Sequence, residues 1–370
     1  MRVHVVDPSA YTPPYDHALC HALGRAGAEV TLVTSRFAYG DVPPADGYAR
    51  RELFYRAALG SPGSRLRAAT KLAEHVPDML RYRRLARAAD VVHFQWLSVQ
   101  HLDARLLPRP RRPGAPPRPL VLTAHDILPR EPRPGQLAAQ RRLYERFDAI
   151  VVHSAHGRSR LTGELGVDPA RVHVIPHGAL THLTTGPPQP PPFQTDRPVV
   201  LFFGLLRPYK GLDLLLDAWR GIDDAELWVV GMPRFDISPL RDTAPPGVRF
   251  LPRFVTDEEL AACFARADLA VLPYREIDQS SVAFTALAAG VPLLLSDVGG
   301  FPELAATGAA RTFPAGDVPA LHAALQGLLS DPAALSAMSA RARAAAAGPY
   351  SWDTIARRTL DLYGGIAGHT

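Results

Sequence analysis

A proline-rich segment is the feature that most restricts how this chain can fold. Within six residues the sequence carries five prolines, Pro187, Pro188, Pro190, Pro191 and Pro192. Proline fixes the backbone φ angle and has no N–H group, so neither a helix interior nor a central strand continues through such a run. We therefore predict a linker over 181–198, with one domain on each side. The 370 residues are enough to give both domains full cores.

Short apolar runs alternate with helix-like segments on both sides of this linker. The strand-like runs cover 3–6, 29–33, 91–94, 120–124, 149–152, 172–175, 199–203, 227–230, 248–251, 269–272 and 293–295, with a weaker one at 52–55. Helical spacing occurs at 15–26, 65–88, 136–147, 155–164, 211–221, 257–266, 280–289, 317–328 and 333–346. The segment 108–119 is rich in Pro and Arg and is predicted to be a surface loop. This alternation predicts an α/β fold of two doubly wound parallel sheets, which bind ligands beside the carboxyl ends of their strands.

The charge of the chain is unevenly distributed. Residues 1–185 hold 26 Lys and Arg against 16 Asp and Glu, whereas the remainder holds 15 against 20. A basic first half attracts an anionic membrane surface, a phosphorylated acceptor or nucleic acid, although a coding bias toward Arg and Ala gives the same excess. The basic runs lack interleaved aromatic residues and match no nucleic-acid module, so we do not expect nucleic acid as a partner.

The sequence also indicates where the protein works. It has no run of 18 apolar residues, and its first residues, MRVHVVDPSA, are too short and polar for a signal peptide. Cys20 and Cys263 lie far apart and form no metal-type spacing. We therefore predict a cytoplasmic protein with no disulfide, and we leave open peripheral contact with the inner face of a membrane.

The stretch LFFGLLRPYKG, residues 201–211, combines a strand, a tight turn and a helix start. The apolar strand ends at Gly204, and the turn that follows carries Arg207 and Lys210. Free backbone N–H groups, the helix dipole and two side-chain cations suit a diphosphate. The alternative is that both cations merely solvate a surface loop.

Four stretches together resemble one known family. They read FFGLLRPYKGLDLLLDAW, FARADLAVLPYREIDQSSVAFTALAAGVPLLLSDVGGFPE, TAHDILP and VIPHG. In this order and spacing they are similar to the retaining, nucleotide-sugar-dependent glycosyltransferases of family 4, which have the two-Rossmann GT-B architecture. The resemblance implies an acceptor domain over 1–180, a donor domain over 199–349, and a cleft between them. It also implies that a last helix at about 350–366 crosses back onto the first domain.

The resemblance assigns roles to residues of the second domain. It places Arg207 and Lys210 on the donor diphosphate, where their charge would stabilise the departing phosphate in the transition state. It brings Gly204 and the helix start at Gln279, Ser280, Ser281 and Val282 to the same anion, although Ser280 also suits a simple N-cap. Backbone groups that frame the base would come from Gly231, Arg253 and Phe254.

The chain departs from the commonest pattern of this family at one point. That pattern has two glutamates eight positions apart, where this chain has Ile277 and Thr285. Thr285 offers only one weaker hydroxyl contact to the ribose, and Glu276 or Asp278 are alternative replacements. The chain is similar instead to a subgroup with Arg-Pro-Tyr-Lys-Gly and Gln-Ser-Gly motifs, with Ser281 in place of that glycine.

On the first domain the resemblance points to the strand end at His125, which would approach the transferred sugar. Asp126 follows it, and the preceding strand ends with His93, Gln95 and Trp96. We expect these residues, together with Tyr15 after the first strand, to line the acceptor site. His153 and His177 are expected to be packing residues, because most lone histidines are structural.

The activity implied is transfer of a sugar from a nucleoside-diphosphate sugar, UDP- or GDP-linked, to a hydroxyl acceptor with retained anomeric configuration. It would serve the biosynthesis of a polysaccharide, another glycan or a secondary metabolite. The resemblance implies no cofactor and no metal. Three alternatives remain: another reaction of the same architecture, such as phosphorolysis; a non-catalytic nucleotide-sugar-binding protein or partner subunit; and a membrane-surface protein, marked by the basic first half.

Overall fold

The computed structural model describes residues 1–370 except 62, 98, 109–117, 129–133, 187–188 and 369–370. The chain divides into two compact units. The first unit holds Met1–Pro176 and Trp352–Thr370, and the second holds His177–Ser351. Most of the predicted surface loop 108–119, and Pro187 and Pro188 of the predicted linker, lie outside the described residues.

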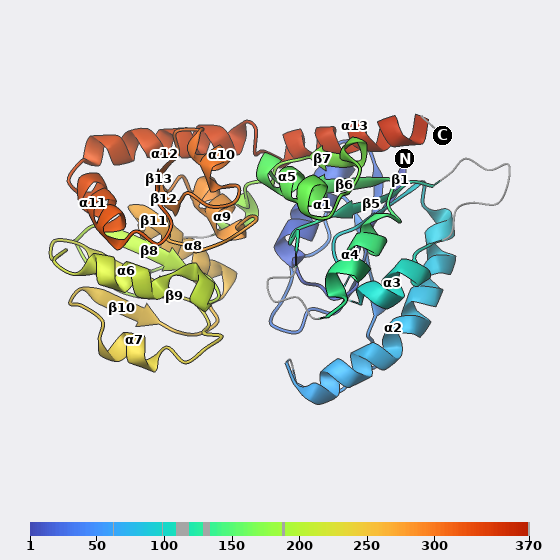
Figure 1. Ribbon diagram of the computed structural model, residues 1–370, viewed down its shortest axis with the longest axis horizontal. Helices are drawn as coiled ribbons and strands as arrows, with labels where there is room; N and C mark the ends of the chain where they lie inside the picture. Colours follow the sequence, from blue (N-terminus) through green and yellow to red (C-terminus); the bar gives the residue numbers. More distant parts are fainter. Residues whose placement is uncertain (62, 98, 109–117, 129–133, 187–188, 369–370) are drawn as a thin grey trace. The chain divides into compact units, whose positions relative to one another are not determined.

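The first unit is built on a parallel sheet of seven strands in the order β3-β2-β1-β4-β5-β6-β7 (Figure 1). The order reverses between β1 and β4, which lie side by side with Val3 opposite Val91. The strands are β1 Arg2–Asp7, β2 Glu29–Ser35, β3 Ala49–Phe54, β4 Val91–Phe94, β5 Leu120–Thr123, β6 Ala149–Val152 and β7 Val172–Val174.

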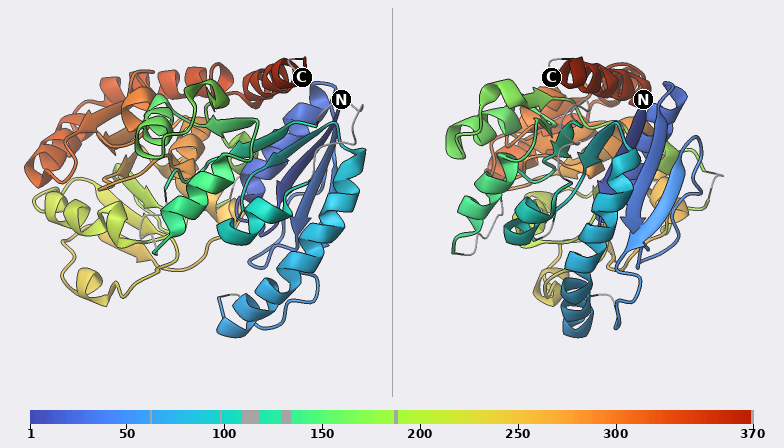
Figure 2. Two further views of the ribbon diagram at one scale, coloured as in Figure 1. Left: turned by 45° about the vertical axis from the view of Figure 1, so that its right-hand side comes forward. Right: turned by 90° about the vertical axis from the view of Figure 1, so that its right-hand side faces the viewer.

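Helices cover both faces of this sheet because its strands are apolar on both sides. Val91 of β4 packs toward α1 (Pro13–Arg25) and α13 (Trp352–Gly368), whereas Val92 and Phe94 pack toward the opposite face. That face carries α2 (Arg65–Leu85), α3 (Gln100–Leu106), α4 (Gln136–Tyr144) and α5 (Ala155–Glu164). In Figure 2, α13 (dark red) belongs to the unit that begins the chain (dark blue), so the last helix completes the core of the first unit.

The second unit repeats the plan with six parallel strands in the order β10-β9-β8-β11-β12-β13. Its strands are β8 Val199–Phe203, β9 Glu226–Val230, β10 Val248–Leu251, β11 Leu269–Leu272, β12 Leu293–Ser296 and β13 Ala310–Phe313. One face is covered by α6 (Leu212–Trp219) and α11 (Val318–Leu329). The other is covered by α8 (Asp257–Arg266), α9 (Ser281–Ala289), α10 (Phe301–Ala305) and α12 (Pro332–Ala347).

The predicted fold class is confirmed, since both sheets are parallel, doubly wound and covered on two faces. Most predicted strands and helices end within a few residues of their observed ends. The prediction missed α3, α10, β13 and α7 (Ser238–Asp242), all of seven residues or fewer. Elements this short show too few apolar repeats to be recognised from spacing.

Candidate active site

In each sheet the strand order reverses once within a doubly wound pattern, and several of the sequence-predicted site residues lie at those two points. In the second unit β8 and β11 are neighbours, and the loop after β8 carries Arg207 and Lys210. In the first unit β1 and β4 are neighbours, and Gln95 and Trp96 directly follow β4. Crevices form at such points because the connections on the two sides run in opposite directions.

Lys210 lies against the backbone that ends β8. Gly204 has φ +115°, and a Cβ atom there would come 2.8 Å from Nζ of Lys210 and 3.2 Å from Cγ2 of Val282. Lys210 is only 7% exposed, and its Nζ lies 5.1 Å from the ring centroid of Tyr274. The structure therefore brings together Gly204, Lys210 and the first turn of α9, as the sequence predicts for an anion site.

The turn that carries these cations is held by an arginine that the sequence analysis did not single out. Arg275 donates to the carbonyl oxygen of Pro208 at 2.9 Å and to both carboxylate oxygens of Asp213 at 2.9 and 2.6 Å. Its backbone N–H also donates to the carbonyl of Tyr209 at 2.8 Å. Arg207 itself is exposed, and among the described residues its guanidinium has no ion-pair partner.

The start of α9 has free polar groups. Ser280 is its N-cap, but the Ser280 side chain makes no capping hydrogen bond, and its backbone N–H donates to Oε1 of Gln279 at 3.2 Å. Ser281 is exposed. Thr285 lies one turn further on, is buried, and donates its hydroxyl to the carbonyl of Ser281 at 3.1 Å. The N–H group of Ala283 donates to the carbonyl of Ser280 at 3.1 Å, so in this turn the N–H groups of Ser281 and Val282 are the ones suited to an anion.

The residues predicted to frame the base lie at neighbouring strand ends. Gly231 follows β9, where its backbone passes so close to Gly204 that a side chain at 231 would overlap the carbonyl of Gly204. The guanidinium of Arg253 donates to the carbonyl of Phe254 at 2.9 Å and forms an ion pair with Glu259 at 2.6 Å. Hydrogen bonds from Arg253 and from the backbone of Thr256 hold the pKa of Glu259 at about 2. Phe254 is exposed.

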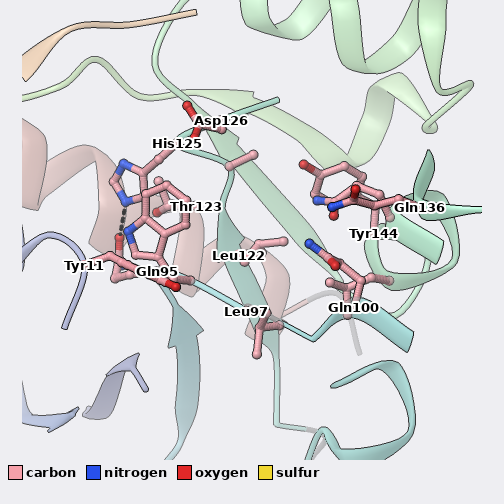
Figure 3. A pocket seen from close by; sticks show the side chains of 14 residues that line it. Tyr11, Gln95, Leu97, Gln100, Leu122, Thr123, His125, Asp126, Gln136 and Tyr144 are labelled. Carbon is pink, nitrogen blue, oxygen red and sulfur yellow. Dashed lines mark hydrogen bonds between the residues drawn. The ribbon is translucent and has the colours of Figure 1, made fainter. Parts of the chain in front are cut away.

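On the first unit, four predicted residues line one cavity of about 500 Å³. They are His125, Gln95, Trp96 and Asp126 (Figure 3). The prediction missed most of the other polar and aromatic groups in the lining, which include Tyr11, Gln100, Gln136, Gln140 and Tyr144. In Figure 3 Gln100, Gln136 and Tyr144 lie across the cavity from His125 and Gln95. Four of the missed residues come from α3 and α4, and α3 had no sequence signal.

His125 is held in a fixed orientation at the cavity wall. Its Nε2 lies 3.1 Å from Oε1 of Gln95, and its Nδ1 lies 3.2 Å from Nε2 of His153. The ring stacks on Trp96 at 5.1 Å and meets the ring of Tyr15 edge-on at 4.8 Å. His153, which the sequence analysis expected to be a packing residue, bonds through Nδ1 to the carbonyl of Ile175 at 3.0 Å. Burial lowers the pKa of His153 to about 4, so it meets His125 as a neutral ring.

Two predicted acceptor residues, His93 and Tyr15, do not line this cavity. His93 is buried beneath it, 2.6 Å from the hydroxyl of Tyr363 in α13 and 2.8 Å from that of Thr123. Burial lowers the pKa of His93 to about 3. Tyr15 is also buried, and its ring supports His125 from behind the wall.

A buried carboxylate shapes another part of the cavity wall. Asp7, at the end of β1, accepts backbone N–H groups from Ser9 at 3.2 Å, Tyr11 at 2.6 Å and Thr12 at 3.2 Å. Its neighbour Asp16 is equally buried, and burial together with the negative charge of Asp7 raises the pKa of Asp16 well above its usual value. The loop after β1, residues 8–12, contains no glycine, and the hydrogen bonds to Asp7 fix its backbone.

The amide groups in the lining have unused hydrogen-bonding capacity. Gln95 is 1% exposed, and its Nε2 has no hydrogen-bond partner among the described residues. The same holds for Oε1 of Gln140. A buried donor and a buried acceptor that lack partners cost free energy.

The described part of the chain contains no cluster of three His, Cys, Asp or Glu residues that suits a metal ion. Within those same residues, no helix combines the length and apolar character needed to cross a lipid bilayer.

Two protein-family models match the chain, one on each side of the linker. The model "Glycosyltransferase Family 4" matches residues 15–183, and the model "Glycosyl transferases group 1" matches residues 197–331.

Two relatives with named activities cover most of this chain. The D-inositol 3-phosphate glycosyltransferase of Mycolicibacterium paratuberculosis is 28% identical over 378 residues, covering 92% of this chain and 82% of the relative. The GDP-mannose-dependent alpha-(1-6)-phosphatidylinositol monomannoside mannosyltransferase of Mycolicibacterium smegmatis is 29% identical over 291 residues, covering 73% of this chain and 76% of the relative.

A solved structure extends the likeness to the whole fold. Anabaena HepE in complex with UDP-glucose superposes with a TM-score of 0.73 at 18% identity, covering 99% of this chain and 100% of that chain. The matched models, the named transferases and the shared architecture lead to one conclusion. This chain belongs to the family 4 glycosyltransferases of GT-B fold, and it is a glycosyltransferase enzyme.

Proposed function

We propose that this enzyme transfers a sugar from a nucleoside-diphosphate sugar to a hydroxyl group of its acceptor, with retention of the anomeric configuration. The observation that carries the proposal is the buried Lys210, whose ammonium lies against Gly204 and the first turn of α9. A buried cation beside the backbone N–H groups of a helix start suits the dianionic diphosphate of such a donor.

In this reaction the protein acts chiefly by electrostatic stabilisation of the transition state. The bond between the anomeric carbon and the phosphate oxygen breaks, and negative charge develops on the leaving diphosphate. Lys210 and Arg207 stabilise this charge, so no metal is needed there. The acceptor hydroxyl attacks from the same face and gives its proton to the departing phosphate. No carboxylate nucleophile takes part, which differs from the paired carboxylates of retaining glycosidases.

We propose a UDP- or GDP-linked donor. A relative is named for GDP-mannose, and a structural neighbour holds UDP-glucose. The missing glutamate pair leaves the ribose and sugar hydroxyls to other groups. In this proposal residues Gln279 to Val282, at the start of α9, make the contacts to these hydroxyls. Thr285 is less suited, since its hydroxyl already bonds to Ser281.

We propose that the acceptor is a polyhydroxyl compound, and that it occupies the cavity beside His125. The lining supports this because amide and aromatic side chains recognise sugar-like surfaces: amides pair with hydroxyls, and aromatic faces cover C–H groups. The lining supplies such amides from Gln95, Gln100, Gln136 and Gln140, and such aromatic faces from Trp96 and Tyr144.

The purified chain tests this proposal directly. It is incubated with UDP-glucose, GDP-mannose and their ADP and dTDP counterparts, with a panel of glycosides as acceptors and with excess chelator. We expect one nucleoside diphosphate to be released in proportion to product, and NMR of the product to show the donor's anomeric configuration. An inverted product, or transfer that depends on a divalent metal, would contradict the mechanism.

We further propose peripheral contact with the cytoplasmic face of a membrane through the basic first unit. The charge excess of residues 1–185 supports this, because such a surface attracts anionic lipids.

A further inference from the structure

Helix α2 turns an apolar face toward solvent. Leu66, Leu72 and Leu80 are 57, 54 and 43% exposed, and Val76 and Pro77 are exposed between them. A surface helix normally buries its apolar face and exposes its polar one. In α2 the inward positions are His75, Asp78, Met79 and Tyr82, so its polarity is partly reversed.

The spacing of these side chains makes them one continuous surface. Residues 66, 69, 72, 73, 76, 77 and 80 are all exposed, follow one another at intervals of three or one, and fall on the same side of a helix. Leu59, 63% exposed, joins them, because its backbone N–H donates to the hydroxyl of Thr70 in α2 at 3.2 Å. We call Leu59, Leu66, Leu72, Val76 and Leu80 the apolar face of α2.

Cations border the apolar face. Segment 65–88 holds seven Lys and Arg, of which Arg65, Arg81, Arg84 and Arg87 are exposed, against only Glu74 and Asp78. Both acids are already engaged. Asp78 is buried and pairs with Arg81 at 2.7 Å, and Glu74 accepts the backbone N–H of Ala57 at 3.0 Å. The border of this face is therefore strongly positive.

We propose that α2 binds an anionic lipid surface, with its apolar face inserted among the acyl chains and its arginines on the headgroups. This inference rests on the proposed peripheral contact and makes it more specific. It names α2 as the helix that binds the membrane, and it adds insertion of apolar side chains to the electrostatic attraction of the arginines. A helix with apolar side chains flanked by Lys and Arg lies in the membrane interface in this way. The length of α2, 21 residues, gives it several turns of contact.

Two other occupants fit less well. A second copy of the chain would bring the two sets of arginines together across a two-fold axis, and like charges oppose such pairing. Nucleic acid would satisfy the arginines, but aliphatic side chains have no partner on a phosphate backbone.

Vesicle sedimentation of the full chain tests the proposal, using phosphatidylcholine vesicles with and without 30% phosphatidylglycerol. We expect binding only to the anionic vesicles, with a fraction that stays bound at high salt because of insertion. Replacing Leu66, Leu72 and Leu80 by Gln should weaken binding at least tenfold and abolish the salt-resistant fraction. Arg84→Gln with Arg87→Gln should weaken binding at low salt. Leu137→Gln, an exposed leucine of α4, is the matched control.

Three results would overturn the proposal: no binding to anionic vesicles, wild-type binding by the triple leucine variant, or a wild-type dimer that the triple variant dissociates. Release of nucleoside diphosphate with a soluble acceptor is measured on the same samples. It should be unchanged in the leucine variant, so failure of membrane binding is distinguished from failure of the proposed transfer.

Discussion

Lys210 is an unusual lysine because it is nearly buried, yet its ammonium lies at the end of a strand where a ligand would approach. Burying a cation is costly unless it meets an opposite charge. The contact with the Tyr274 ring offsets part of this cost. A diphosphate bound at this strand end would add a direct interaction between opposite charges, which is why we assign the catalytic charge chiefly to this residue.

Lys210→Ala should therefore lower kcat by about 100-fold or more, since one preorganised charge in an active site is worth that much. Arg207→Ala should lower it less, because Arg207 is exposed and its charge is screened by water. Arg220→Ala, an exposed arginine beyond α6, serves as the control. Turnover near wild type in Lys210→Ala would remove the diphosphate assignment.

Gly204→Ala tests the position of the ammonium without removing its charge. The added methyl would lie 2.8 Å from Nζ of Lys210, so one of the two must move. Gly221→Ala is a matched control, because Gly221 also has a positive φ of +83° but has no atom within 4 Å of the added Cβ. Both variants should lose similar backbone stability, measured by thermal unfolding. Only Gly204→Ala should lose most of its transferase activity, and equal activity in the two would contradict the assignment.

At the scale of elements, the 3₁₀ turn Pro208–Lys210 depends on α6 and on the segment after β11. Arg275 connects them, since it bonds to the carbonyl of Pro208 and to Asp213 in the first turn of α6. The pair is about half exposed, and such pairs contribute less than about 1 kcal/mol to stability. We infer that Arg275 acts mainly by positioning the turn.

Arg275→Gln should accordingly lower kcat about tenfold while the melting temperature changes little. Asp213→Asn should have a smaller effect in the same direction, because the bond from Arg275 to Pro208 remains. Arg275→Lys should restore part of the rate, since an ammonium can still donate to one partner. A large fall in stability with unchanged kcat would mean that Arg275 is structural only.

Two buried histidines of the first unit, His93 in β4 and His153 directly after β6, should make stability depend on pH. Burial lowers the pKa of His93 to about 3 and of His153 to about 4, against 6.5 for an ordinary histidine. Between about pH 6.5 and 4 the unfolded chain therefore binds more protons than the folded one. The free energy of unfolding should fall as pH decreases through this range, by up to about 1.4 kcal/mol per pH unit for each histidine.

Urea unfolding at pH 7, 6 and 5 measures this dependence. His93→Gln keeps a hydrogen-bonding side chain but does not titrate, so its acid slope should be smaller than that of the wild type. Asp7 and Asp16 act in the opposite direction, because burial raises their pKa values and favours the folded state at lower pH. The wild type and the His93→Gln variant both contain Asp7 and Asp16, so the difference between their slopes is free of this contribution. Identical slopes would show that His93 does not titrate differently on unfolding.

The sequence was a good guide to strands and to the residues at their ends, because buried parallel strands are short continuous apolar runs. It therefore placed Gly204, Lys210, Gln95 and His125 correctly at strand ends. It could not tell a side chain that faces the cavity from one that faces the core. His93 and Gln95 lie two positions apart, yet only Gln95 reaches the cavity, because β4 ends at Phe94 and the backbone turns there. Arg275 has no local pattern, since its partners are about 60 residues away.

At the scale of the whole molecule, the first unit is discontinuous in sequence. Its core includes Ile355, Ala356 and Tyr363 of α13, and Tyr363 reaches His93. A chain that ends at Ser351 lacks α13, so the apolar side chains of α1 and of the sheet that α13 covers should become exposed. The free energy of unfolding of the first unit should fall by several kcal/mol. Scanning calorimetry should show that the first unit's transition disappears while that of the second unit, complete at Ser351, remains. Tyr363→Phe, which removes only the hydrogen bond, should keep both transitions.

The same discontinuity sets an order of events during synthesis. Ribosomes add about 5–20 residues per second, and domains usually fold as soon as they emerge. Here the second unit is complete before α13 is made, so the unit that begins the chain is the last to close. Until then its α1 surface has no cover, and a nascent chain stalled between residues 177 and 351 should bind chaperones more than the finished protein does. The first unit can therefore bury its core only after α13 has been made, although most of that unit is synthesised first.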